Sequence, residues 1–136
     1  MSASAFKTAI LLVILATSTA CASGGSLLAD AASPDGRYRA RLLDCPDPAD
    51  FQGRELLGIV FESQGPAPAC QETHLPNVRA WFAAAAPRDG GAGSVEWVDG
   101  QARFALSGNI IKSQSPPPAP GGLITIVGAG RSNDGN

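Results

Sequence analysis

The sequence predicts an all-β fold, a small antiparallel sandwich or partly open barrel of five to seven short strands. Glycine and proline contribute 16 and 11 of the 136 residues, and this level disfavours long helices and favours short strands joined by turns. Apolar and polar residues alternate in two runs, residues 37–42 and 95–104, as they do in half-buried strands. One of these runs is interrupted by Asp99-Gly100, and this dipeptide is a strong sequence signal for a β-hairpin.

An early strand follows the turn sequence Pro-Asp-Gly at residues 34–36. In residues 37–42 three arginines alternate with Tyr38, Ala40 and Leu42. We expect these three side chains to face the core and the arginines to face water. A row of arginines can meet anionic lipid or glycan, but it more often protects the edge of a sheet.

The hairpin at residues 95–104 is predicted in residue detail. A two-residue turn at Asp99-Gly100 sets the register, which opposes Val98 to Gln101, Trp97 to Ala102, Glu96 to Arg103 and Val95 to Phe104. We expect Trp97 and Phe104 to face the core, with Trp97 a core residue rather than a ligand platform. Glu96 and Arg103 form an ion pair on the other face.

Three further segments complete the prediction. Residues 56–61 are almost continuously apolar and predict a central strand, and residues 123–127 predict the last strand. Residues 78–86 contain five alanines and follow Asn77, a possible helix N-cap, so propensity favours a helix. The neighbouring strands favour a strand instead, which we expect. The proline-rich residues 113–122 predict an extended, exposed connector.

The first 20 residues predict an export signal. Lys7 supplies a positive charge, residues 9–16 form an unbroken apolar run, and small residues at 17–20 lead up to Cys21. A basic start, a short apolar core and a small-residue cleavage region define such signals. The apolar run is too short to span a bilayer, which needs about 20 residues.

The end of this signal resembles the cleavage box of bacterial lipoproteins. Thr19, Ala20 and Cys21 suit its last three positions, whereas Ser18 stands where that family usually has leucine. The resemblance implies that Cys21 becomes the N-terminus and carries lipid, which makes a membrane the first partner. Ala22 in place of aspartate implies an outer-membrane lipoprotein that faces the periplasm or the surface. The alternative is ordinary secretion of a soluble protein.

The three cysteines predict one disulfide. An odd number in an exported protein implies a separate fate for one sulfur, and lipidation or removal of Cys21 leaves Cys45 and Cys70, which are 25 residues apart. Exported proteins meet an oxidising compartment, so we expect these two to pair. A metal site is disfavoured: Cys70 and His74 are four apart, but Cys45 has no close ligand neighbour. We expect no metal and no other cofactor.

The expected organisation is a signal peptide (1–20), a tether (21–33), a single β domain (34–130) and a disordered tail (131–136). Loss of the signal removes Lys7, so nine of the ten cations remain against twelve anions, a net charge of −3. Nucleic-acid binding needs a basic face, and we expect no nucleic-acid partner.

Catalysis is not expected. His74 is the only histidine and no G-x-S-x-G nucleophile motif is present. The carboxylates that merit attention are the group Asp44, Asp47 and Asp50 and the pair Glu55 and Glu62. The group lacks the glycine and terminal glutamate of an EF-hand, so we expect a solvated loop. The two glutamates are seven residues apart on one strand and therefore lie on opposite faces.

Three segments and a cysteine together resemble a group of small exported bacterial β proteins of uncharacterised function. The segments are Ser-Pro-Asp-Gly-Arg-Tyr-Arg-Ala at 33–40, Val-Glu-Trp-Val-Asp at 95–99 and Gly-Leu-Ile-Thr-Ile at 122–126, with the cysteine soon after the first. The chain departs from that group by its second cysteine, Cys70, and by the proline-rich insertion. The resemblance covers about a third of the mature chain; it implies an all-β fold and no activity.

The expected function is that of a non-catalytic envelope lipoprotein, a binding or accessory module whose partner is an envelope protein or a glycan. The alternative is a secreted or periplasmic inhibitor of a hydrolase, which would present a loop such as the proline-rich segment to the enzyme.

Metabolic labelling tests the fate of Cys21. We expect radiolabelled palmitate to enter the wild-type protein and not Cys21→Ser, because a serine hydroxyl cannot form the thioether that carries the diacylglycerol. Equal labelling of both proteins, or a soluble mature protein that begins at Ser23, would contradict lipidation.

Overall fold

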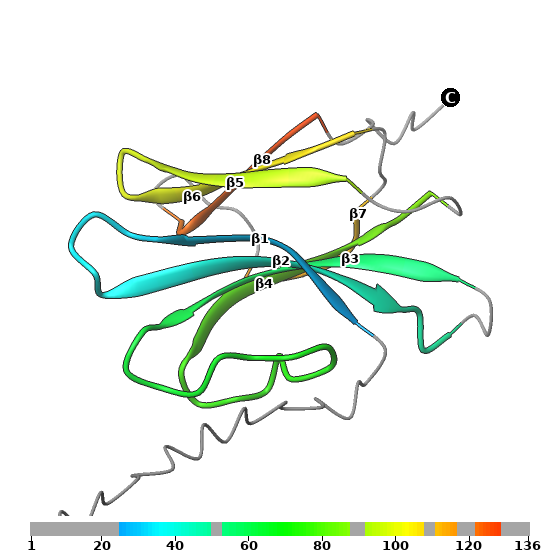
Figure 1. Ribbon diagram of the computed structural model, residues 1–136, viewed down its shortest axis with the longest axis horizontal. Coiled ribbons are helices and arrows are strands. Elements are labelled where there is room, and N and C mark those ends of the chain that lie inside the picture. The colour runs from blue at the N-terminus through cyan, green and yellow to red at the C-terminus, as the bar shows by residue number, and fades with distance from the viewer. Residues whose placement is uncertain (1–24, 50–52, 88–91, 108–110, 117–121, 129–136) are drawn as a thin grey trace, which may run out of the picture.

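The computed structural model describes residues 25–49, 53–87, 92–107, 111–116 and 122–128, which form eight strands and no helix (Figure 1). The strands are β1 (Ser26–Ala32), β2 (Tyr38–Pro46), β3 (Arg54–Glu62), β4 (Val78–Ala85), β5 (Gly93–Val98), β6 (Gln101–Leu106), β7 (Ile111–Ser115) and β8 (Ile124–Val127). They form two layers, as Figure 1 shows, and the predicted all-β sandwich is confirmed. The predicted signal peptide, Cys21 and the tail lie outside the described residues.

The larger sheet has the order β1-β2-β3-β4-β7, and every neighbouring pair in it is antiparallel. The smaller sheet has the order β5-β6-β8, and β8 runs parallel to β6. The expectation of a purely antiparallel fold is therefore wrong for one pair. After β6 the chain crosses to the larger sheet and forms β7 there. It then returns to the smaller sheet as β8, which runs in the same direction as β6.

β1 occupies most of the segment that the sequence suggested is a tether. It pairs with β2 from Ser26 opposite Asp44 to Ala32 opposite Arg39, which raises the number of strands to eight. Its small residues have little β propensity of their own. Side-chain bonds support its pairing with β2: Asp30 accepts hydrogen bonds from the guanidinium groups of Arg39 and Arg41 on β2.

Tertiary context decides two other segments. The alanine-rich residues from Val78 to Ala85 form a strand, β4, between β3 and β7, as expected. The sequence does not predict β7 (Ile111–Ser115), because the segment is polar and its residues 113–115 belong to the predicted connector. In the structure the strand is mostly exposed. It pairs with β4 and so forms an edge strand of the larger sheet.

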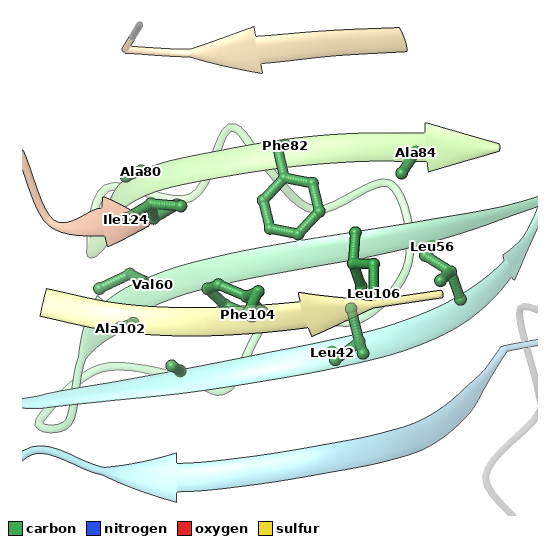
Figure 2. Close-up of a cluster of buried hydrophobic side chains, with 11 residues drawn as sticks. Leu42, Leu56, Val60, Ala80, Phe82, Ala84, Ala102, Phe104, Leu106 and Ile124 are labelled. Atoms are coloured by element: carbon green, nitrogen blue, oxygen red, sulfur yellow. The ribbon is translucent and has the colours of Figure 1, made fainter. Parts of the chain in front are cut away.

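The core lies between the two sheets (Figure 2). Phe82 of β4 and Phe104 of β6 meet edge to face, with ring centroids 5.0 Å apart. Gly58 on β3 leaves the space for this contact, since a β-carbon there would overlap the Phe82 ring. The other buried members of the cluster are Ala40, Leu42, Leu56, Val60, Ala80, Ala84, Ala102, Leu106 and Ile124.

The outer face of the larger sheet is also covered. The loop at 63–77 leaves β3 and returns to β4, and Cys70 within it bonds Cys45 near the end of β2. The Cα atoms of the two cysteines are 5.8 Å apart, within the range of about 4.4–6.8 Å for disulfides, and the predicted bridge is confirmed. Around it, Leu43, Leu57 and the partly buried Trp81 form a second apolar cluster.

The β5–β6 hairpin has the predicted register throughout. Phe104 is fully buried, and Glu96 and Arg103 are exposed, with their closest charged atoms 3.9 Å apart. Trp97 packs against the edge of the core but is only half-buried, and its indole Nε1 donates a hydrogen bond to the Ala31 carbonyl, 3.0 Å away. Trp97 therefore packs against the core, as expected, but it lies at the edge of the core because β1 holds its ring at the seam between the sheets.

Substitutions on the two faces of the hairpin should have unequal effects. Phe104→Ala should lower the free energy of unfolding by about 3–5 kcal/mol, because a buried aromatic ring leaves a cavity. Glu96→Ala should lower it by less than about 1 kcal/mol, because the ion pair is exposed. Urea unfolding measures both values. Similar costs for the two variants would contradict this placement of the core.

Candidate functional site

The two ends of the sandwich differ in character. One end, here called the turn end, carries the β1–β2 turn at 33–37, the β5–β6 turn at 99–100 and the end of β3 at Glu62 (Figure 1, left). The opposite end, the disulfide end, carries the start of β1 and the Cys45–Cys70 bridge. The hollows described below lie at the turn end.

Side-chain hydrogen bonds hold the β1–β2 turn. The Ser33 hydroxyl donates to Oδ1 of Asp35 at 2.6 Å, and the backbone N–H of Arg37 donates to the same oxygen at 3.0 Å. The backbone N–H of Tyr38 in turn donates to the Ser33 hydroxyl at 3.0 Å. Gly36 has φ +73°, a conformation that glycine adopts without strain. The Asp35 carboxylate is therefore exposed yet fixed in place.

Asp35 is an acceptor at neutral pH. The hydrogen bond from Ser33, followed by the bond from the Arg37 backbone, lowers the pKa of Asp35 below its ordinary value of 3.8. Both donors favour the charged form, since an ionised carboxylate accepts hydrogen bonds more strongly than a protonated one. This group presents a fixed negative charge rather than a transferable proton.

Beside this turn lies a pair of aromatic rings. Tyr38 of β2 and Trp97 of β5 are stacked, with ring centroids 6.4 Å apart and planes 20° from parallel. The Arg37 guanidinium lies 5.1 Å from the centroid of the Tyr38 ring. A hollow of about 250 Å³ is lined by these two rings together with Ser33, Pro34, Asp35 and Gly100.

A second hollow lies along the same turn. Its volume is about 410 Å³, and it is lined by Asp35, Gly36, Arg37, Glu62 and Gln64. Arg79 pairs with Glu62, with 2.9 Å between Nη2 and Oε1. The two hollows have one lining residue in common, Asp35, and together they are called the concave region below.

This region is suited to binding. Its lining contains carboxylates, a guanidinium, an amide and a hydroxyl, but neither histidine nor cysteine. The Ser33 hydroxyl is buried and donates to Asp35 while it accepts from the Tyr38 backbone, so its hydrogen bonds are made within the turn.

The carboxylates singled out in the sequence do not meet. Asp44 is buried and pairs with Arg54, whose Nε is 2.9 Å from its Oδ1, whereas Asp47 pairs with Lys112. Asp50 lies outside the described residues. Within the described ranges no group of three or more histidine, cysteine or acidic residues could hold a metal ion.

Glu55 and Glu62 lie near opposite ends of β3, and their spacing of seven residues also places them on opposite faces of the sheet. Burial raises the pKa of Glu55, and the negative charge of Asp47 raises it further. His74 is exposed on the disulfide-bonded loop. Of these three residues, Glu62 lines the concave region, and Glu55 and His74 do not.

Sequence reasoning missed the turn end as a site. Its signal was present, since the Asp-Gly turns at 35–36 and 99–100 are both flanked by an aromatic residue, Tyr38 after the former and Trp97 before the latter. Only the packing of the two sheets brings the two rings together.

Comparisons of the chain with models of protein families, with curated proteins and with solved structures found no match. The resemblance to small exported bacterial β proteins therefore stays a prediction. In the part of the chain that the structure describes, no helix is long and apolar enough to cross a membrane.

A ¹³C NMR titration of the Asp35 carboxyl tests the turn. We expect a midpoint below 3.8 in the wild-type protein and a higher midpoint in Ser33→Ala, because the Ser33 hydroxyl is the largest cause of the lowered pKa. The lowered folded-state pKa stabilises the fold above the unfolded value of about 3.8–3.9, and this contribution is lost as the pH falls through the folded-state value.

The control variant is Ser94→Ala, which removes an exposed hydroxyl from β5. It should leave the Asp35 midpoint unchanged. If Ser33→Ala also leaves it unchanged, the assigned cause is wrong.

Proposed function

We propose that this protein is a non-catalytic binding module, held at an envelope membrane by lipid on Cys21, that presents its turn end away from the membrane. The observation that carries the proposal is the placement of the two ends. The strand nearest to Cys21 in sequence begins at the disulfide end, and the concave region lies at the other end.

Chain geometry supports this arrangement. Ser26 is five residues after Cys21, so their Cα atoms are at most about 18 Å apart. From Ser26, β1 runs for seven residues, about 20 Å, to the turn at 33–37. An anchor on Cys21 would keep the disulfide end close to the bilayer and leave the turn end accessible to a partner.

The disulfide fits an exported protein, because such bonds persist in oxidising compartments. A binding role fits the lining of the concave region, where an aromatic pair lies beside fixed polar groups. Ligand sites commonly combine apolar side chains with a few well-placed polar groups in this way.

One observation favours the alternative, an inhibitor of a hydrolase. The loop at 63–77 is fixed by the disulfide at Cys70 and by Asn77, whose Nδ2 donates to the carbonyls of Glu62 and Pro66. Gln71 and His74 are exposed on this loop. A rigid exposed loop is what an inhibitor would insert into the cleft of an enzyme, since preorganisation lowers the entropic cost of binding.

Photo-crosslinking in the cell that produces the protein separates these functions. A benzophenone amino acid is placed at Asp99 on the turn end, at His74 on the loop or at Ala49 near the disulfide end; all three positions are exposed. We expect adducts, seen as a mobility shift, from Asp99 and none from Ala49. Adducts from His74 alone would favour the inhibitor, and equal adducts from Asp99 and Ala49 would contradict a binding site at the turn end.

A further inference from the structure

We infer that the two hollows beside the β1–β2 turn form one site for a neutral oligosaccharide built of pyranose rings. This inference rests on the proposed binding function and names its ligand class. The site is defined by Tyr38, Trp97, Asp35, Arg37, Glu62 and Gln64.

The aromatic pair supplies the apolar part of the site. A pyranose ring exposes C–H groups on its faces, and these pack against aromatic side chains, which carry large apolar surfaces. Both residues are half-buried and line the same hollow, so part of each side chain borders the space that a ligand would fill. Trp97 is held through its Nε1 bond to Ala31, and the Tyr38 ring contacts both Trp97 and the Arg37 guanidinium. The pair is therefore preorganised, which lowers the cost of binding.

The polar part of the site suits a polyhydroxylated ligand. The side chains of Asp35, Glu62 and Gln64 each end in a planar group with two adjacent heteroatoms, and Arg37 ends in a planar fork of donors. Adjacent hydroxyls of a sugar can donate to a carboxylate and accept from a guanidinium. Asp35 is fixed by its bonds to Ser33 and Arg37 and lines both hollows, so it can bond a sugar that also contacts the rings.

The charge of the site favours a neutral ligand. Asp35 and Glu62 contribute two negative charges, and Arg37 together with Arg79, the partner of Glu62, contributes two positive charges. The sum over the site and Arg79 is zero, because Arg79 neutralises Glu62, so this part of the surface has no net charge that would attract an anionic lipid headgroup or a basic peptide. Its specificity has to come from hydrogen bonds and ring packing, and these are the interactions that a neutral sugar makes.

The test is an NMR titration of the full chain as the cell produces it, in a detergent without a sugar headgroup. The probes are cellotetraose, maltotetraose and tetra-N-acetylchitotetraose, with a sulfated tetrasaccharide as the charged comparison. We expect at least one neutral probe to shift the amide signals of Gly36 and Gly100 saturably, with a Kd of about 1 mM or tighter. The amide of Gly58, beneath Phe82 in the core, should not shift.

Matched aspartates provide the variants. Asp35→Asn should weaken binding at least about tenfold, the effect of losing one charge-assisted hydrogen bond. Asp47→Asn is the matched control, because Asp47, like Asp35, accepts a hydrogen bond from the backbone N–H two residues later, that of Ala49 at 2.9 Å. It should not weaken binding, because Asp47 lies near the disulfide end. Gln64→Ala provides a second test, since Gln64 is exposed and its loss should weaken binding without unfolding the turn.

Three outcomes would overturn the inference: no shift with any neutral probe, binding of the sulfated probe alone, or equal weakening by Asp35→Asn and Asp47→Asn. Palmitate labelling that depends on Cys21, together with adducts from Asp99, would in that case leave the proposed binding function standing with a ligand of another class.

Discussion

Burial of β3 on both faces is the constraint around which the rest of the structure is arranged. Six consecutive residues of this strand, 56–61, are buried, and side chains alternate between the faces of a sheet. Each face therefore needs its own cover. The smaller sheet covers one face through Phe104, and the disulfide-bonded loop covers the other near Leu57. The Cys45–Cys70 bridge is placed where it fastens that loop to the neighbouring strand, β2.

The same arrangement creates the turn end. Because the smaller sheet lies across the larger one, the β5–β6 hairpin brings Trp97 beside Tyr38 of β2. The hydrogen bond from Trp97 to Ala31 ties the hairpin to the edge strand β1. A polar tie at the seam between the sheets leaves both rings half-buried, a position that serves a binding surface better than the interior would.

Arginines of the larger sheet pair with carboxylates on neighbouring strands rather than forming a free cationic face. Arg39 and Arg41 were expected to face water as part of a row, but both bond Asp30 on β1. This pairing helps to hold an edge strand whose own sequence has little β propensity. Asp44, which is buried, similarly depends on Arg54, because a buried carboxylate is costly unless it is paired.

Local sequence was sufficient wherever one short-range rule governed the outcome. The Asp99-Gly100 turn determined the register of the β5–β6 hairpin, and strict alternation determined which face Ala40 and Leu42 present. An odd number of cysteines, together with the predicted export signal, implied the Cys45–Cys70 bond. Tertiary structure alone decided the segments whose own signals are weak: that residues 26–32 form a strand, that β7 pairs with β4, and that β8 runs parallel to β6. It also decided the candidate site, since Tyr38 and Trp97 belong to different sheets. Their contact depends on how two sheets pack, and that is a property of long-range burial, which no local pattern of residues encodes.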